Sequence, residues 1–320
     1  MRIVILDGYT TNPGDLNWQA LASLGELVVY EHTSASETVE RASQAEIVIS
    51  NKTVLGSKVI EKLPNLRYIG LLSTGCTVVD LQATRRRGIP VTNIPAYSTQ
   101  SVAQLVFALL LELTNHVQSH SDSVFRGDWA RSRDFCYWNQ PQTELAGKTM
   151  GIVGYGQIGQ AVARIAQAFG MQVLVCGRPS SQKEKTLSPG LRLTSFEAVL
   201  EGSDAVSLHC PLTNETRELI NRHTLERMKS GALLINTSRG SVLNETEVAE
   251  ALRDGRLGGF AADVLSTEPP SPRNPLLRAP NCLLTPHIAW ATYEARARLI
   301  AIAAQNLAAF LNDAPVNVVN

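Results

Sequence analysis

Short apolar runs alternate with amphipathic segments along nearly the whole chain, and this alternation constrains the fold more than any other feature. Such runs are typical of strands buried on both faces of a parallel sheet, and the segments between them are typical of crossover helices. The sequence therefore predicts an α/β protein of doubly wound parallel sheets. The expected strands are residues 2–6, 27–30, 47–50, 68–72 and 91–93, then 149–153, 172–176, 205–209, 233–237, 259–264 and 282–285.

The two groups of strands predict two domains, which a chain of 320 residues is long enough to form. Between them, residues 98–120 carry apolar side chains at helical spacing, and we expect one long helix that crosses between the domains. Residues 122–144 are polar and aromatic, which favours an extended arm over a core segment. Further helix starts are expected as capping boxes, at Thr194 with Glu197 and at Asn244 with Glu247, and a last helix at about 292–312.

Composition argues against several classes of protein. The formal net charge is zero and 44 % of the residues are apolar, as in ordinary globular proteins. We expect no nucleic-acid partner, because bulk binding needs a basic surface, and no membrane partner, because the longest apolar stretch is too short to span a bilayer. Five scattered cysteines without a C-x-x-C pair favour a reducing cytoplasm, and no cluster has the spacing of a metal site.

A glycine-rich turn follows the expected strand at 149–153. Gly154, Gly156 and Gly159 form a G-x-G-x-x-G pattern between a strand and a helix, and this setting makes the short pattern specific. The first glycine permits a tight turn, the second lets the backbone approach a pyrophosphate, and the third lets the helix pack closely on the sheet. Phosphate charge is favoured at such a helix N-terminus. The pattern predicts a dinucleotide site, with a tight turn that binds no ligand as the alternative.

The end of the next strand bears on the choice of cofactor. An acidic residue there would bind the ribose 2′-hydroxyl of NAD, but this chain has Gly177, Arg178 and Ser180 instead. An arginine can pair with a 2′-phosphate through two parallel hydrogen bonds, and a serine hydroxyl can add another. The sequence therefore favours NADP(H) and leaves NAD(H) open. A solvated surface arginine is the alternative for Arg178.

Three residues far apart in the chain have the chemistry of hydride transfer to a 2-keto acid. His287 follows an expected strand, at the sheet edge where ligands bind, and can supply a proton to the substrate oxygen. Glu268 can hold the imidazole and raise its pKa. Arg239, also after a strand, is a fixed cation suited to a carboxylate and to polarising the adjacent carbonyl. A packed histidine, a loop glutamate and a surface arginine are the alternatives.

The remaining histidines have less chemical settings. His209 ends the expected strand at 205–209, and we expect it to line the cofactor site without proton chemistry. The other four have no predicted partners. No G-x-S-x-G elbow is present, which argues against a serine hydrolase.

The chain resembles the D-isomer-specific 2-hydroxyacid dehydrogenases over essentially its full length, through GIVGYGQIGQAVA, HCPLTNETRELIN, MKSGALLINTSRGSVLNETEVAEAL, AADVLSTEPP and TPHIAWAT. The resemblance implies that Arg239 orients the substrate, Glu268 supports the histidine and His287 is the acid/base. It implies a discontinuous, flavodoxin-like substrate domain at 1–98 and 288–320, a Rossmann-type nucleotide domain at 99–287, and a cleft between them. Further cofactor contacts are expected at Gln157, Ile158, Pro211, Thr216, Thr237, Ser238 and Asp263.

Within that family, DGYTTNPGDLNW, DFCYWNQP and PHIAWAT look most like the glycerate dehydrogenases, also called hydroxypyruvate reductases. The family's carboxylate-binding loop falls at Ser73, Thr74 and Gly75, whose backbone N–H groups form a plausible cradle. Asn51 and Lys52 are expected to face the same crevice. Lys52 is either a second cation for the substrate or a solvated loop lysine.

The resemblance also implies that the arm at about 122–144 joins two subunits of a homodimer. Trp138 on this arm would either cap a small polar substrate in the partner's active site or only fill the subunit contact. Two other readings of function stay open. One is a dehydrogenase for a different D-2-hydroxyacid, and the other is a binding protein that senses a dinucleotide on the same scaffold.

Overall fold

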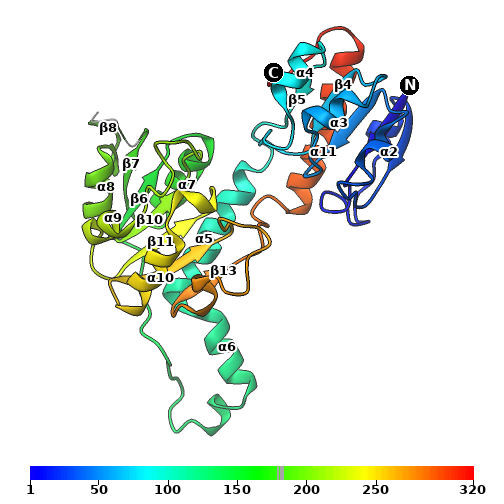
Figure 1. Cartoon of the computed structure of the whole chain (residues 1–320). Coiled ribbons are helices and arrows are strands. Elements are labelled where there is room, and N and C mark those ends of the chain that lie inside the picture. The colour runs from blue at the N-terminus through cyan, green and yellow to red at the C-terminus, as the bar shows by residue number, and fades with distance from the viewer. Residues whose placement is uncertain (179, 181–183) are drawn as a thin grey trace. The chain divides into compact units, whose positions relative to one another are not determined.

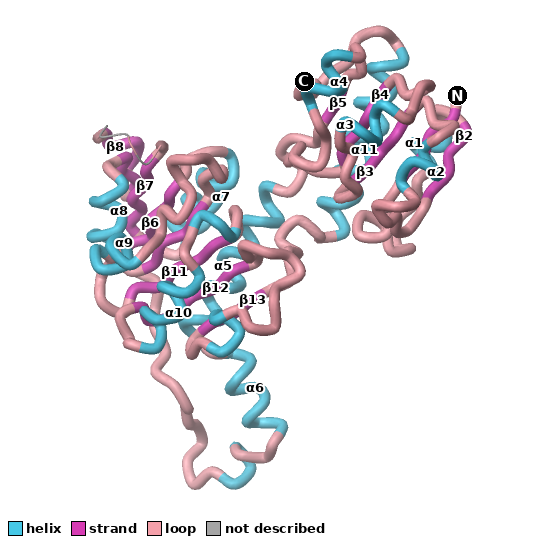
Figure 2. Tube along the Cα trace, in the orientation of Figure 1, coloured by secondary structure: helices cyan, strands magenta, loops and turns pink. Residues whose placement is uncertain are grey.

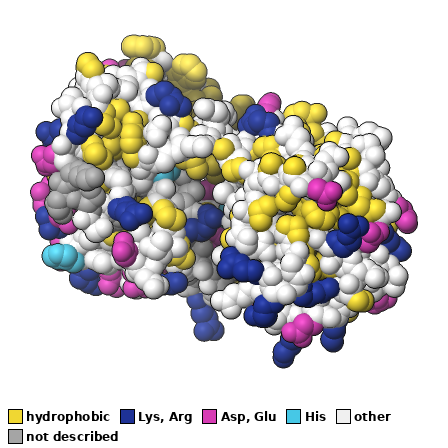
Figure 3. Space-filling model, turned by 90° about the horizontal axis from the view of Figure 1, so that it is seen from above, with side chains coloured by type: hydrophobic (Ala, Val, Ile, Leu, Met, Phe, Trp, Pro, Cys, Tyr) yellow, Lys and Arg dark blue, Asp and Glu magenta, His cyan; other side chains and the backbone are white. Residues whose placement is uncertain are grey.

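The computed structural model describes residues 1–178, 180 and 184–320, and the chain divides into two compact units. Unit 1 consists of Met1–Ser98 together with Trp290–Asn320, and unit 2 consists of Thr99–Ala289. The expected return to the first domain, at residue 288, lies two residues before this division. Basic and acidic side chains are interspersed on the face of each unit seen in Figure 3. No helix in the described part of the chain has the length and apolar character needed to cross a bilayer.

Unit 1 is built on a five-stranded parallel sheet in the order β2-β1-β3-β4-β5 (Figure 1). Successive residues of a strand point to opposite faces, so Ile3 and Ile5 pack with α1 and α11, whereas Val4 packs with α2, α3 and α4. The strands are β1 (Arg2–Ile5), β2 (Glu26–Val29), β3 (Ile47–Ser50), β4 (Tyr68–Leu71) and β5 (Val91–Thr92). The helices are α1 (Gln19–Ala22), α2 (Thr38–Ala42), α3 (Ser57–Glu61), α4 (Leu81–Arg86) and α11 (Tyr293–Leu311).

Unit 2 is built on an eight-stranded sheet in the order β13-β12-β11-β10-β6-β7-β9-β8, in which only β8 runs antiparallel to its neighbour. The strands are β6 (Thr149–Val153), β7 (Gln172–Cys176), β8 (Lys185–Ser188), β9 (Leu191–Leu193), β10 (Ala205–Leu208), β11 (Ala232–Asn236), β12 (Leu257–Ala262) and β13 (Cys282–Leu284). Because β6 and β10 are neighbours although β7 to β9 intervene in sequence, the strand order reverses between them. Such a reversal marks the ligand-binding crevice of doubly wound sheets.

Helices cover both faces of the second sheet (Figure 2). One core contains residues of α5 (Thr99–Asn115) and α7 (Gln157–Ala168), and the other contains residues of α8 (Phe196–Gly202), α9 (Arg222–Arg227) and α10 (Glu245–Arg253). Short 3₁₀ helices lie at η1 (Trp129–Arg131), η2 (Gly240–Val242) and η3 (Pro275–Arg278). The helix α6 (Val117–Phe125) and the segment after it project away from this sheet (Figure 1).

Two local predictions were wrong in detail, and one hairpin was not predicted. The helix expected at 98–120 is two helices, because His116 adopts a left-handed conformation with φ of 50° and Glu112 accepts the backbone N–H of Gln118 through its side chain. The N-cap of α8 is Ser195 instead of Thr194, whereas Asn244 caps α10 as expected. The hairpin β8–β9 was not predicted, because β8 is largely exposed and carries no apolar run.

Candidate functional site

Apart from Trp138 on the arm, the candidate residues of unit 2 follow strands of one sheet at its carboxyl edge. The glycine turn follows β6, Arg178 follows β7 and His209 follows β10. Arg239 follows β11, Glu268 lies in the loop after β12, and His287 follows β13. Because these strands run parallel, their carboxyl ends meet at the same edge of the sheet. The topology therefore brings together residues that are more than a hundred positions apart in sequence.

The glycine turn has the geometry that a bound pyrophosphate requires. Gly154 has φ of +98°, and a Cβ there would lie 2.6 Å from the carbonyl carbon of His209. A Cβ on Gly159 would lie 2.2 Å from the carbonyl oxygen of Gly154, so the start of α7 packs directly on the turn. Gly156 caps α7 with no side-chain hydrogen bond and with open space beside it. Its neighbours Gln157 and Ile158 form no hydrogen bond through their N–H groups within the described residues.

A second observation fits a polar ligand at this edge. The hydroxyl of Thr237, just after β11, is buried and has no hydrogen-bond partner among the described residues. A buried hydroxyl without a partner is destabilising unless a ligand or water satisfies it. Together with the free N–H groups of α7, it makes the residues present a good fit to a dinucleotide. Gly177 has open space around it, and the exposed Arg178 forms no ion pair within the described part of the chain.

The loop after β10 was expected to contact the cofactor through Pro211 and Thr216. Pro211 is exposed, but Thr216 is only 4 % exposed. The Thr216 hydroxyl donates to the carbonyl of Pro211 at 2.6 Å and accepts from the N–H of Thr213 at 2.8 Å. Thr216 therefore holds the loop in shape, and its side chain is already engaged within it. Ser238 is engaged in the same way, because its hydroxyl donates to Oδ1 of Asn236 at 2.8 Å.

His287 and Glu268 form a direct pair. Nδ1 of His287 lies 2.6 Å from Oε2 of Glu268, and the other oxygen, Oε1, accepts the backbone N–H of Leu265 at 3.0 Å. The His287 side chain is 31 % exposed, and no described residue bonds its second ring nitrogen, Nε2. Its backbone has φ of +57°, a left-handed conformation that is uncommon for a residue with a side chain. Such outliers cluster at functional sites.

Asp263 has a role that the sequence analysis missed. It was expected to contact the cofactor, but it is only 1 % exposed and its carboxylate faces the loop of His287. Oδ1 accepts the N–H of Ile288 and Oδ2 accepts that of Ala289, each at 2.8 Å. The Thr285 hydroxyl donates to Oδ1 at 2.6 Å. Asp263 therefore braces the residues on both sides of His287, whereas the family resemblance had pointed to it only as a cofactor contact.

Arg239 is held by a turn that buried Asn236 organises. Nδ2 of Asn236 donates to the carbonyl of Arg239 at 2.9 Å, and Oδ1 accepts the N–H of Ser238 at 3.0 Å. The exposed guanidinium of Arg239 donates to the carbonyl of Ser238 at 2.7 Å. It forms no ion pair with any carboxylate of the described residues. Its charge is consequently free for an anionic ligand.

His209 is held as a neutral group. Nε2 of its ring lies 2.9 Å from the hydroxyl of the buried Ser207. The backbone N–H of His209 donates to the carbonyl of Val153 at 2.7 Å. Burial lowers the pKa of His209 to about 4, so the imidazole carries no charge at neutral pH. That His209 lines the cofactor site without proton chemistry stays a prediction, with which a neutral imidazole is compatible.

Unit 1 carries the expected substrate loops at the carboxyl edge of its own sheet. Ser73, Thr74 and Gly75 follow β4, where the Ser73 hydroxyl donates to the carbonyl of Gly75 at 2.7 Å and that of Thr74 to the carbonyl of Ile94 at 2.8 Å. The N–H groups of Thr74 and Gly75 form no hydrogen bond within the described residues, as a carboxylate cradle requires. Of the neighbouring pair, Asn51 is only 3 % exposed, whereas Lys52 is exposed.

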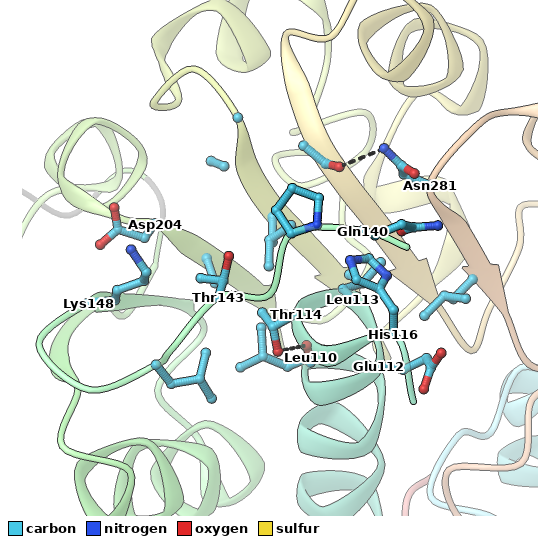
Figure 4. A pocket seen from close by; sticks show the side chains of 18 of the residues that line it. Leu110, Glu112, Leu113, Thr114, His116, Gln140, Thr143, Lys148, Asp204 and Asn281 are labelled. Carbon is cyan, nitrogen blue, oxygen red and sulfur yellow. Dashed lines mark hydrogen bonds between the residues drawn. The ribbon is translucent and has the colours of Figure 1, made fainter. Parts of the chain in front are cut away.

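A cavity of about 710 Å³ lies at the opposite, amino edge of the sheet of unit 2. Lys148 and Asp204 lie on one side of it, and Glu112 and His116 on the other (Figure 4). None of the predicted catalytic residues lines this cavity. It is therefore distinct from the site at the carboxyl edge.

A reversal of strand order, a glycine turn at a free helix N-terminus and a histidine–glutamate pair define a nicotinamide dinucleotide-dependent dehydrogenase. Residues 107–289 match the family described as "D-isomer specific 2-hydroxyacid dehydrogenase, NAD binding domain". The chain belongs to this family.

Named relatives cover essentially the whole chain. It is 46 % identical to the hydroxypyruvate reductase of Blautia hydrogenotrophica over 326 aligned positions that cover 100 % of both chains. It is 39 % identical to the glycerate dehydrogenase of Methylorubrum extorquens, over 91 % of this chain and 90 % of that one. Among solved structures, the acyclic imino acid reductase Bsp5 in complex with NADPH and D-Arg is 30 % identical, with a TM-score of 0.85 and 100 % of both chains covered.

Proposed function

We propose that the chain reduces hydroxypyruvate or glyoxylate to D-glycerate or glycolate with NAD(P)H and also catalyses the reverse reaction. The observation that carries the proposal is the pair of His287 and Glu268, which leaves Nε2 of the imidazole available at the carboxyl edge of a dinucleotide-binding sheet. The relatives named hydroxypyruvate reductase and glycerate dehydrogenase support this choice of substrate.

The residues divide the work of the reaction as follows. A nicotinamide cofactor held at the glycine turn would supply hydride chemistry at the carbonyl carbon. His287 gives a proton from Nε2 to the substrate oxygen, and Glu268 holds the ring through Nδ1 so that Nε2 is presented in one orientation. Arg239 neutralises the substrate carboxylate and polarises the adjacent carbonyl. The N–H groups of Thr74 and Gly75 also bind the carboxylate.

We propose NADP(H) as the preferred cofactor, with NAD(H) accepted. The support is the absence of an acidic residue directly after β7 in the sequence, where Arg178 stands exposed instead. Its guanidinium suits the 2′-phosphate, and Ser180, also exposed, adds a hydroxyl. The Bsp5 reductase with bound NADPH supports the use of this cofactor within the fold.

We further propose a homodimer formed through the arm at about 122–144. Several aromatic side chains there are exposed in the single chain, among them Phe125, Phe135 and Trp138, the last at 69 %. Apolar side chains gathered on a projecting segment favour a protein partner. Sedimentation equilibrium tests this proposal, since a dimer is expected and a monomer at micromolar concentration would contradict it.

We place the enzyme in the cytoplasm, because the described cysteines are all free thiols.

A scan of NADPH and NADH oxidation across a panel of 2-keto acids tests the proposed function. We expect the highest kcat/KM with hydroxypyruvate or glyoxylate and NADPH. A higher value with a bulkier 2-keto acid would assign a different D-2-hydroxyacid as the substrate. Tight cofactor binding without turnover of any acid would instead favour a dinucleotide-sensing protein.

A further inference from the structure

Unit 1 has its own reversal of strand order, between β1 and β3. In the order β2-β1-β3-β4-β5, the helix after β1 packs on one face of the sheet and the helix after β3 on the other. The two connections therefore leave the sheet in opposite directions, and doubly wound sheets bind ligands at the carboxyl edge beside such a reversal. Asp7 stands at this point, two residues beyond the end of β1.

The carboxylate of Asp7 holds the loop that follows the neighbouring strand. It accepts three consecutive backbone N–H groups, those of Asn51 at 2.8 Å, Lys52 at 2.5 Å and Thr53 at 2.7 Å. The hydroxyl of Ser50 lies within 3.4 Å of the same carboxylate and donates to the carbonyl of Thr53 at 3.1 Å. No lysine or arginine forms an ion pair with Asp7 within the described residues, so the amides are its partners.

These bonds decide which group the loop presents to a ligand. Its three N–H groups are occupied by Asp7 and cannot bind substrate. Asn51 is buried and donates through Nδ2 to the hydroxyl of Thr10 at 3.0 Å. Lys52 is exposed, and its ammonium group forms no ion pair within the described part of the chain. The ammonium of Lys52 is therefore the group that this loop offers to an anionic or hydroxylated ligand.

We propose that Asp7 is a positioning residue, which fixes Lys52 so that its ammonium group contacts the end of the substrate beyond the reacting carbon. This inference rests on the proposed function, because it assigns Lys52 to the substrate. The same arrangement occurs in unit 2, where Asp263 at the end of β12 braces the loop after the neighbouring β13. In both units a carboxylate after one strand sets the loop of the next strand in the sheet.

The variant Asp7→Asn separates positioning from simple charge. Asparagine has nearly the same shape, but it has one acceptor oxygen and an NH₂ group that cannot accept the loop N–H groups. It also removes a negative charge beside the binding site of an anion, so electrostatics alone predicts a lower KM. Positioning predicts the opposite sign, with KM for hydroxypyruvate raised about tenfold, in line with the loss of hydrogen bonds to a charged group.

Two further readouts exclude a general loss of structure. Glyoxylate lacks the hydroxymethyl end of hydroxypyruvate, so its KM is expected to change less than about threefold, and the KM for NADPH is expected to stay the same. The matched control is Glu46→Gln, because Glu46 accepts the N–H of Arg2 at 3.3 Å and so joins the starts of the same two strands at the opposite edge. We expect wild-type constants for this control.

The outcomes are separable from those of the proposed function. A wild-type enzyme that turns over no 2-keto acid contradicts the proposed function itself. If the wild-type enzyme is active, and the KM of the Asp7→Asn variant for hydroxypyruvate is unchanged or lowered, the positioning role of Asp7 is overturned. An equal rise in KM for hydroxypyruvate and glyoxylate also overturns it. Lys52→Met is expected to reproduce the selective rise, and wild-type constants for that variant would also overturn the role.

Discussion

Nδ1 of His287 lies 2.6 Å from Oε2 of Glu268, although the two residues are 19 positions apart in sequence. The Glu268 carboxylate accepts a hydrogen bond from Nδ1 of the imidazole, so Nε2 is the ring nitrogen that can donate a proton to a substrate. The loop that carries His287 is braced from the side by Asp263, which bonds the N–H groups of the next two residues. The direction of the imidazole is thus set from two sides before any ligand binds, as preorganised catalysis requires.

Replacing His287 by Ala is expected to reduce turnover at least about 100-fold, because general acid catalysis typically contributes this much. The dissociation constant of NADPH, measured by fluorescence titration, is expected to stay the same. His223→Ala is the matched control, since His223 is exposed on α9 and belongs to no described site. Near wild-type turnover of His287→Ala would remove this residue from its proposed role.

Exchanging Arg178 for Asp is expected to raise the KM for NADPH at least about tenfold, because a carboxylate would replace the bidentate partner of the 2′-phosphate. The KM for NADH is expected to change much less. Arg192→Asp makes the same charge change at an exposed position of β9 and is expected to leave both constants unaltered. Parallel changes for the two cofactors in Arg178→Asp would contradict the preference for NADP(H).

The variant Gly154→Ala is expected to abolish cofactor binding and to reduce the free energy of unfolding by more than about 2 kcal/mol, because it combines backbone strain with a collision. The new Cβ would lie 2.6 Å from the carbonyl carbon of His209. Gly147→Ala isolates the strain, since Gly147 has φ of +77° but no atom within 4 Å of its added Cβ. Urea denaturation of both variants measures the difference, and equal losses would argue against the collision.

Acid is expected to destabilise the fold through His209. Burial lowers its pKa to about 4 in the folded protein, against an ordinary value of 6.5. Between these two pH values the unfolded chain binds a proton at His209 that the folded chain does not. The contribution of neutral His209 to the free energy of unfolding is therefore fully present above pH 6.5 and is lost as the pH falls towards 4. Lowering the pH from 7.5 to 5 is expected to cost about 2 kcal/mol of stability through this group.

His209→Gln tests this assignment by urea denaturation at the two pH values. Its stability is expected to decrease by about 2 kcal/mol less than that of the wild type between pH 7.5 and 5. His223→Gln, at an exposed position of α9, is expected to follow the wild type. The same pH response in His209→Gln and the wild type would assign the acid sensitivity to other groups.

Much of the fold could be predicted from the sequence, because buried parallel strands leave a clear apolar signal. The strands at Ile47–Ser50, Thr149–Val153 and Gln172–Cys176 coincide with the predicted bounds. The hairpin β8–β9 gives no such signal, since β8 is exposed. The break at His116 also lacks a signal, because it depends on a left-handed residue that is neither glycine nor asparagine.

The candidate site likewise contains residues that the sequence could predict and roles that it could not. The residue types and their positions after strands predicted roles for Arg239, Glu268 and His287, and the structure confirms that Glu268 holds the imidazole of His287. The roles of Asp7 and Asp263 were not predictable, because both act through hydrogen bonds to the backbone of a neighbouring loop. Such bonds depend on which strands are neighbours, and strand order is a property of the folded sheet.

The route of the chain through the two units has a consequence for biosynthesis. Unit 2 is a continuous segment, whereas the core of unit 1 needs Leu299, Ala303 and Leu307 of α11, which are translated after the whole of unit 2. Domains generally fold as units while the chain is being synthesised. Unit 1 can therefore be completed only after unit 2 has been synthesised, and one face of its sheet stays incompletely covered until α11 emerges.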